Sequence, residues 1–145
     1  MITLNYFPDS YSDPSSEMQY KLPMIGVSIT HKGKNFRTTG LIDSGSTRTF
    51  IPKEFANIMD LDLTGQTDIM VGANGSFKST KSVIGRCFLR KGENQIFENF
   101  INLHVNVPVN TNTLPCMVFG RDSIFQKFNI TFQEKNEKII LKRVR

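Results

Sequence analysis

The stretch Gly40-Leu41-Ile42-Asp43-Ser44-Gly45-Ser46-Thr47 is the part of this sequence that decides its interpretation. An apolar, β-type segment leads directly into Asp43, and small polar residues follow until apolar residues resume at Phe50. A carboxylate at the end of a buried strand is unfavourable unless hydrogen bonds satisfy it or a reaction uses it. Gly45 allows close backbone approach, and the neighbouring serines supply hydroxyl groups. Taken alone, residues 43–46 fit an Asx-turn, in which Asp43 accepts hydrogen bonds from nearby amides.

Outward from this stretch, the sequence predicts a mostly β protein. It contains 12 Phe and many Thr, Val and Ile residues, which favour strands. Pro52 suits the first position of a helix, so a short helix is predicted over 52–59. A second helical segment of one or two turns is predicted over 123–128. Turns with Gly, at 31–35 and at Asn74-Gly75, predict two hairpins. Strands are predicted over residues 1–7, 24–30, 36–42, 68–71, 80–90, 98–107, 117–119, 129–133 and 138–144.

The length of 145 residues predicts one domain. Residues 1–20 are expected to form an N-terminal strand or arm and a linker rich in Ser, Asp and Pro, and residues 21–145 the domain itself. A two-lobed enzyme with one catalytic group on each lobe does not fit this length unless two chains combine.

The charge of the chain is basic, with a formal net charge of +5. Nucleic-acid binding is therefore one alternative, through basic residues near the C-terminus. These are Lys135, Lys138, Lys142, Arg143 and Arg145. A strand divides such residues between two faces, so a solvated surface is favoured and we expect no nucleic-acid partner. The phosphate-binding patterns G-x-x-x-x-G-K-[ST] and G-x-G-x-x-G are both absent from the sequence.

The cysteines and histidines predict neither a metal site nor a disulfide framework. Cys87 and Cys116 are not spaced with His31 and His104 as zinc ligands, so we expect two reduced thiols in the core and no cofactor. The N-terminus lacks the basic and apolar regions of a signal peptide. No apolar run approaches the ~20 residues that span a bilayer. A cytoplasmic protein without a membrane partner is expected.

A second motif extends the first. Residues 117–125 read Met-Val-Phe-Gly-Arg-Asp-Ser-Ile-Phe, an apolar strand that ends at Gly120 and is followed by Arg and a short helix. With the loop at Asp43, the hairpin before it and the Asn74-Gly75 hairpin after it, this motif resembles the retropepsin-like aspartic proteases over roughly residues 22–141. Their active-site loop reads apolar–Asp–Thr/Ser–Gly–Ala/Ser–Thr. Ser46 departs from the Ala that is common in retroviral enzymes and matches pepsin-like ones.

The resemblance implies a closed acid-protease β-barrel with one or two short helices, and an aspartic endopeptidase without a cofactor. Peptide hydrolysis then needs a base that activates water and an acid that protonates the amide nitrogen. Two adjacent carboxylates that share one proton supply both roles. Because this chain has one such motif, the resemblance implies a homodimer in which both Asp43 carboxylates act on a peptide or protein substrate. In the family, chain termini interleave across the dimer, and residues 141–145 are expected to do so here.

The resemblance also assigns roles to single residues. Asp43 is the catalytic carboxylate, and Ser44 hydrogen-bonds across the dimer axis. Gly45 accepts a substrate amide through its carbonyl, and Ser46 donates to the outer carboxylate oxygen. The flap that closes over substrate is expected at Gly72, Ala73, Asn74, Gly75 and Ser76.

Residues next to these motifs receive no catalytic role. Ile84 either lines a substrate subsite or belongs to the core, whereas Phe50 and Phe119 are expected in the core. Arg121 is expected to form internal ion pairs or hydrogen bonds.

Two other functions remain open from the sequence. A retropepsin-like domain of weak activity would serve dimerisation or peptide binding, although the intact Asp-Ser-Gly triplet argues against it. A serine hydrolase would use a hydroxyl near Asp43 with His31 or His104 as base, but the G-x-S-x-G elbow is absent from the sequence.

Overall fold

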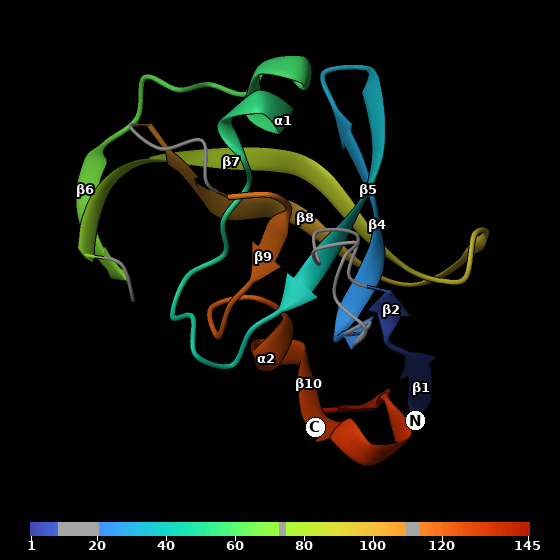
Figure 1. The fold of residues 1–145 in the computed structure, drawn as a ribbon. Coiled ribbons are helices and arrows are strands. Elements are labelled where there is room, and N and C mark those ends of the chain that lie inside the picture. The colour runs from blue at the N-terminus through green and yellow to red at the C-terminus, as the bar shows by residue number, and fades with distance from the viewer. Residues whose placement is uncertain (9–20, 73–74, 110–113) are drawn as a thin grey trace, which may run out of the picture.

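The computed structural model describes residues 1–8, 21–72, 75–109 and 114–145. Its largest sheet has six strands, in which β6, β7, β4, β5 and β9 follow one another and β8 pairs with β7 (Figure 1). Their bounds are β4 Met24–His31, β5 Lys34–Ile42, β6 Thr67–Gly72, β7 Gly75–Lys91, β8 Gln95–Pro108 and β9 Met117–Phe119. The path through these strands is open, so the strand ladders alone do not form the closed barrel that the resemblance implied. Isolated bridges at Phe50 link Asn106 of β8 with Val118 of β9.

The long strand β7 organises this sheet. One of its edges pairs with β8, and the other pairs first with β6 and then with β4. Its residues alternate between buried and exposed positions along much of their length, and the buried set includes Ile84, Cys87 and Leu89. The inner face of the sheet therefore carries the core, together with Val27 and Ile29 of β4.

The turn between β4 and β5 is tighter than the sequence suggested. Strand pairing continues to His31 and Lys34, which leaves Lys32 and Gly33 as a two-residue turn in place of the expected five. Both have positive φ, 48° and 76°. Hairpin turns of this kind need positive φ at both central positions, because their backbone twist then matches that of the strands.

Strand β9 joins the sheet through long-range pairing. It runs parallel to β5, so that Ile42 lies opposite Phe119. Its other edge faces Phe50, whose amide donates to the carbonyl of Val118 at 2.8 Å and whose carbonyl accepts from the Val118 amide at 2.9 Å. The chain therefore leaves the sheet after Ile42, turns through the Asp43 loop, and returns at Phe50 on the far side of β9.

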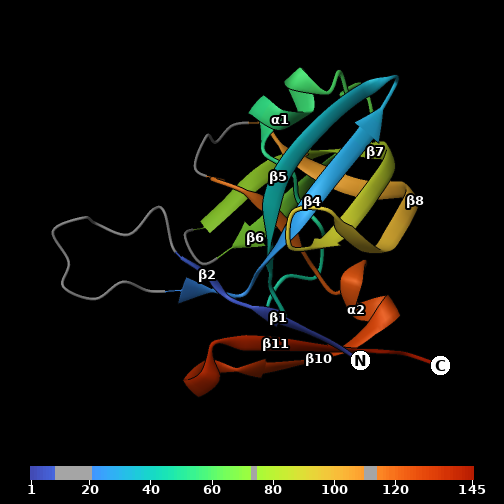
Figure 2. The ribbon, with the colours of Figure 1, turned by 90° about the vertical axis from the view of Figure 1, so that its right-hand side faces the viewer.

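A second, three-stranded sheet carries both chain ends (Figures 1 and 2). Its order is β1 (Ile2–Asn5), β11 (Lys138–Arg143) and β10 (Phe128–Gln133), all antiparallel. The expected strand over 1–7 is thus confirmed in large part, and the short strands β2 (Phe7–Pro8) and β3 (Lys21–Leu22) pair beside it. Residues 9–20, the expected linker, lie outside the described residues, and the division at residue 20 stays a prediction.

The two edges of β11 are occupied to different extents. Residues 138–141 pair with both β1 and β10, whereas Lys142 and Arg143 pair with β10 alone. The expectation that residues 141–145 join a sheet across a dimer stays a prediction. Among the described strands of this sheet, the edges belong to β1 and β10.

Both predicted helices are present but short. The first, α1, covers Lys53–Ile58, with Pro52 as the residue before it, and α2 covers Ile124–Lys127. A 3₁₀ turn, Glu134–Asn136, joins β10 to β11. Both cysteines are buried, as expected. Burial raises the pKa of the Cys87 thiol to about 12. No helix in the described ranges is long and apolar enough to cross a membrane.

An ionic cluster on β8 holds the two sheets together. The Glu98 carboxylate is 11% exposed and pairs with Arg143 of β11 and, at 3.4 Å, with Lys127 of α2. The same cations also donate to carbonyl groups of β8. Arg143 donates to the Phe97 carbonyl at 2.9 Å, and Lys127 donates to the Asn99 carbonyl at 3.1 Å. The Arg143 side chain is exposed at the surface, but its guanidinium is engaged by Glu98 and by the Phe97 carbonyl of β8.

The Glu98 cluster should make stability depend on pH. Burial raises the pKa of Glu98, but hydrogen bonds from the Asn99 amide and Arg143, with the charges of Lys127 and Arg143, outweigh it and hold the pKa below its usual value. This contribution is present above the ordinary Glu pKa and is lost as the pH falls through the lowered value. Glu98→Gln should lower the free energy of unfolding by about 1–2 kcal/mol at pH 7.

Urea unfolding at several pH values tests this expectation. The difference between Glu98→Gln and the unmodified protein should shrink below about pH 4, where the carboxylate becomes protonated. Glu54→Gln, at an exposed position in the first turn of α1, is the matched control and should change little. A Glu98→Gln effect that stays constant from pH 7 to strong acid would contradict the electrostatic explanation.

Candidate active site

Asp43 lies where β5 ends, and backbone groups hold it in place. Its amide donates to the carbonyl of Phe119 at 3.0 Å, which ties the first residue of the loop to β9. The Gly45 amide donates to Asp43 Oδ1 at 2.9 Å, and the Ser46 amide donates to the Asp43 carbonyl at 3.2 Å. The Asx-turn predicted from the sequence is therefore present. Asp43 is nevertheless half-buried rather than enclosed, so its carboxylate remains accessible.

Gly45 has a packing reason to be glycine. A Cβ atom at this position would lie 3.2 Å from Asp43 Oδ1. That contact is tighter than usual, so a side chain here would press on the carboxylate and disturb the hydrogen bond that orients it. The residue best suited to this position is consequently glycine.

The two serines of the loop differ in their surroundings. Ser44 is exposed, and its expected bond across a dimer axis stays a prediction because one chain is described. The hydroxyl of Ser46 donates to the carbonyl of Arg48 at 2.7 Å. The expected bond from Ser46 to the carboxylate is therefore not the one formed, because a backbone acceptor two residues away uses the hydroxyl hydrogen. Ser46 shapes the turn in this structure.

Beneath the loop lies a buried hydrogen-bond network that sequence reasoning missed. Thr49 is fully buried, and its Oγ1 donates to Asp122 Oδ1 at 2.6 Å. The same oxygen lies 2.6 Å from Ser123 Oγ and accepts from the Gly120 amide at 3.2 Å. One hydroxyl thus fixes the loop after Asp43 to the turn after β9. The polar Asp122-Ser123 pair directly before the apolar Ile124 and Phe125 was the available signal.

Gly120 permits the close contact between these two turns. A Cβ atom there would lie 2.1 Å from the carbonyl oxygen of Arg48 and 2.8 Å from that of Ser46. The next amide, that of Arg121, donates to the Ser46 carbonyl at 2.8 Å. Arg121 thus contributes its backbone to the loop while its side chain is exposed.

The predicted second hairpin is present next to this region. Strands β6 and β7 pair from Thr67 and Thr80 up to Gly72 and Gly75, so three of the expected flap residues, Gly72, Gly75 and Ser76, lie at its tip. The other two, Ala73 and Asn74, lie outside the described residues. Gly75 has φ 109°, a conformation that favours glycine.

Aromatic packing connects this hairpin to the loop. The rings of Phe77 and Phe50 lie 5.8 Å apart between their centres. Phe50 is half-buried rather than fully in the core, whereas Phe119 and Ile84 are completely buried. Ile84 is therefore a core residue and not part of a subsite. Two apolar side chains on the hairpin face solvent, Ile69 at 71% exposure and Val71 at 86%.

The histidines do not form a catalytic pair with the loop serines. His31 Nδ1 accepts from the Gly85 amide at 3.0 Å, and His104 is exposed on β8. Since Ser46 donates to a backbone carbonyl, the described contacts contain no serine–histidine couple at the loop. In the part of the chain that the structure describes, no three His, Cys, Asp or Glu side chains gather as metal ligands.

Comparison with known proteins agrees with this architecture. A crystal structure of a retropepsin-like aspartic protease from Rickettsia conorii aligns with the chain at a TM-score of 0.56. The chain has a retropepsin-like fold. The two sequences are 17% identical, and the alignment covers 81% of this chain and 88% of the other, so the similarity establishes the fold alone. No protein-family profile and no curated protein matches the sequence.

Proposed function

We propose that this protein is an aspartic endopeptidase that acts as a homodimer. The observation that carries the proposal is the placement of Asp43 in a retropepsin-like fold. Asp43 is half-buried at the end of β5. Three backbone amides fix its position: its own donates to the Phe119 carbonyl, that of Gly45 to Asp43 Oδ1, and that of Ser46 to the Asp43 carbonyl. A fixed but accessible carboxylate is suited to polarise a water molecule.

The chemistry requires a second carboxylate. Attack of water on an amide carbonyl needs one group to take a proton from the water and another to give a proton to the leaving nitrogen. Two close carboxylates cannot both be ionised, so they hold one proton between them and can fill both roles. The chain has one Asp-Ser-Gly loop. We therefore propose that two chains meet at their Asp43 loops around a two-fold axis.

The surrounding residues fit an extended peptide substrate. In the proposed dimer, the β6–β7 hairpin closes over the peptide as a flap, with Gly72, Gly75 and Ser76 at the tip. The exposed Ile69 and Val71 give this hairpin an apolar surface. We propose that apolar side chains on either side of the cleaved bond are favoured, because they remove that surface from water.

Dilution should test the shared active site. If each site needs two chains, specific activity on a peptide library should fall as the protein is diluted below its dimer dissociation constant. Light scattering under the same conditions should show the mass falling from twice 16.5 kDa towards 16.5 kDa. Specific activity that stays constant while the mass falls to that of one chain would contradict the proposal.

Subunit mixing provides the matched control. An excess of Asp43→Asn chains should trap active chains in mixed dimers with one carboxylate and so reduce their activity. An equal excess of Asp60→Asn chains should leave activity unchanged, since Asp60 is exposed at the end of α1, outside the loop. A stable dimer that cleaves no peptide between about pH 3.5 and 7, where such carboxylate pairs work, would instead favour a dimerisation or peptide-binding module.

A further inference from the structure

A cavity of about 410 Å³ lies between the N-terminal strands, β4 and the loop that joins β7 to β8. Its volume falls in the range of roughly 300–1,000 Å³ that small-molecule sites occupy. Its floor is made of the buried residues Leu4, Met24 and Ile25. Exposed polar residues, among them Asn5, Lys91 and Gln95, surround them. The cavity therefore combines an apolar interior with a polar rim.

Arg90 forms part of the wall and is held rigidly. Its guanidinium lies over Gly26, where a Cβ atom would come within 3.2 Å of Arg90 Cζ. Nη2 donates to the carbonyls of Val27 and Thr38 at 3.2 and 3.3 Å, and Nη1 donates to those of Gly92 and Glu93, both at 3.3 Å. A β-bulge between Leu89 and Arg90 accompanies this arrangement, as bulges commonly do where a side chain is redirected.

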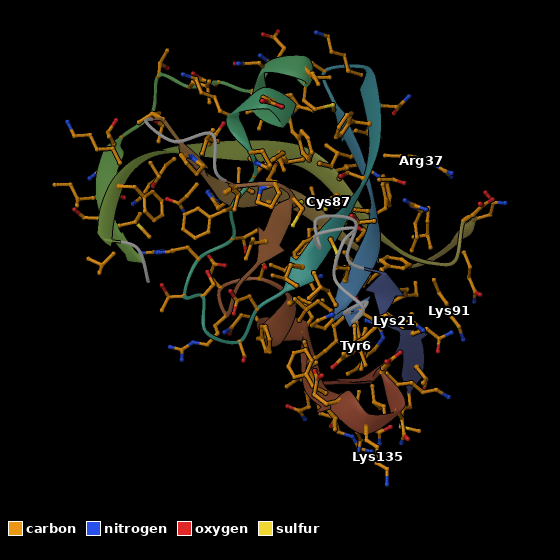
Figure 3. The ribbon with its side chains drawn as sticks, in the orientation of Figure 1. Tyr6, Lys21, Arg37, Cys87, Lys91 and Lys135 are labelled. Atoms are coloured by element: carbon orange, nitrogen blue, oxygen red, sulfur yellow. The ribbon has the colours of Figure 1, made fainter. Side chains whose placement is uncertain are left out.

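The positive charge of this wall is not neutralised by the residues that line the cavity. Arg90 and Lys91 both line it, and none of the lining residues is acidic. The hydrogen-bond acceptors of the Arg90 Nη atoms are neutral carbonyls. Figure 3 shows Arg37 and Lys91 on the right-hand side of the view, beyond β4 and β5. Burial lowers the pKa of Arg90, and the charge of Arg37 lowers it further, while Glu93 acts in the opposite direction.

A bound anion would compensate this charge. Two cationic side chains beside an apolar floor produce a positive potential that water screens less than it does on an open surface. A ligand that fits must carry a negative group towards Arg90 and Lys91 and an apolar body towards Leu4, Met24 and Ile25. A carboxylate fits this wall, because Lys91 can donate charge-assisted hydrogen bonds to it. Arg90, whose Nη hydrogens already bond to four carbonyls, contributes its positive charge.

We propose that this cavity binds the carboxylate of a small amphipathic acid, which accepts hydrogen bonds from Lys91 at the rim and is attracted by the charge of Arg90 in the wall. Two sources share this chemistry, a free alkyl carboxylate and the C-terminal carboxylate of a short apolar peptide. The site lies outside the Asp43 loop and does not depend on the proposed peptidase activity.

Methyl NMR of the full chain tests the proposal. The six methionines can be labelled at their methyl groups, so that Met24 reports on the cavity and Met59, in the core beside α1, serves as an internal reference. Octanoate and N-acetyl-Leu-Leu are titrated in parallel with octanol and N-acetyl-Leu-Leu amide, which keep the apolar body and lack the charge. The Met24 signal should shift with the acids at concentrations about tenfold lower than with the neutral compounds.

Charge variants distinguish the site from a general surface effect. Lys91→Glu should weaken binding of the acids about fivefold to tenfold, whereas Lys135→Glu, on the 3₁₀ turn of the other sheet, should leave it unchanged. Lys91 is exposed, so its replacement should not prevent folding. Tighter binding of either acid supports the proposal and identifies the preferred source. Equal shifts with acids and neutral compounds, an unaltered affinity of Lys91→Glu, or a Met24 signal that does not move would overturn it.

Discussion

Replacing Asp43 by Asn should abolish peptide hydrolysis and leave the fold intact. In the proposed mechanism the carboxylate pair supplies both the base and the acid, and an amide at this position can do neither. Loss of general acid–base catalysis predicts a fall of at least about 10³-fold in kcat/KM. The measurement is cleavage of a peptide library between about pH 3.5 and 7, the range suited to such carboxylates.

The fold of Asp43→Asn should survive because the loop keeps its bonds. An Asn side chain offers an oxygen to the Gly45 amide, which now donates to Asp43 Oδ1 at 2.9 Å. The free energy of unfolding should therefore change by less than about 1 kcal/mol. Asp60→Asn is the matched control and should cleave the library normally. Undiminished cleavage by Asp43→Asn would exclude Asp43 as the catalytic group.

Replacing Gly120 by Ala should cause a large loss of stability. The added Cβ would lie 2.1 Å from the Arg48 carbonyl oxygen and 2.6 Å from its carbon, and both are backbone atoms. Backbone cannot rotate away as a long side chain can, so the turn after β9 and the Asp43 loop must separate. We expect the free energy of unfolding to fall by about 3 kcal/mol or more, at the upper end of what overpacking costs.

Denaturant unfolding measures this effect, with Gly72→Ala as the matched control. At Gly72 the nearest atoms to an added Cβ lie at 3.6 and 3.8 Å, which is ordinary van der Waals contact. The free energy of unfolding of Gly72→Ala should therefore differ by no more than about 1 kcal/mol from that of the unmodified protein. Any folded fraction of Gly120→Ala should also lose activity, because Ser46 and Arg48 belong to the loop that positions Asp43. Equal stability of the two variants would show that the turns separate at little cost.

The local elements of this protein followed closely from its sequence. The strand over 117–119 matches β9 at both ends, and the strand over 138–144 exceeds β11 by one residue. The Asx-turn at Asp43 was likewise predictable, since it involves residues two and three positions apart. Short-range turn chemistry and side-chain alternation determine such features, and both can be read in neighbouring residues.

The supporting structure of the candidate site did not follow from the sequence. Thr49 and Ser123 are 74 positions apart, yet their hydroxyl oxygens lie 2.6 Å from each other. The hydrogen bond of Ser46 likewise did not follow from the sequence. Its hydroxyl donates to the Arg48 carbonyl, and whether a carboxylate or a backbone carbonyl is in reach depends on the final shape of the turn.

The sequence by itself determined a mostly β chain with one Asp-Ser-Gly loop placed after an apolar strand. Only the tertiary structure decided that β9 lies between β5 and Phe50, that β11 is an interior strand, and that the Arg90 side chain lies against Gly26 beside a cavity. Each of these depends on backbone segments that are distant in sequence coming within van der Waals contact. Such contacts depend on the packing of the whole chain, and the residue pattern of a single segment does not reveal them.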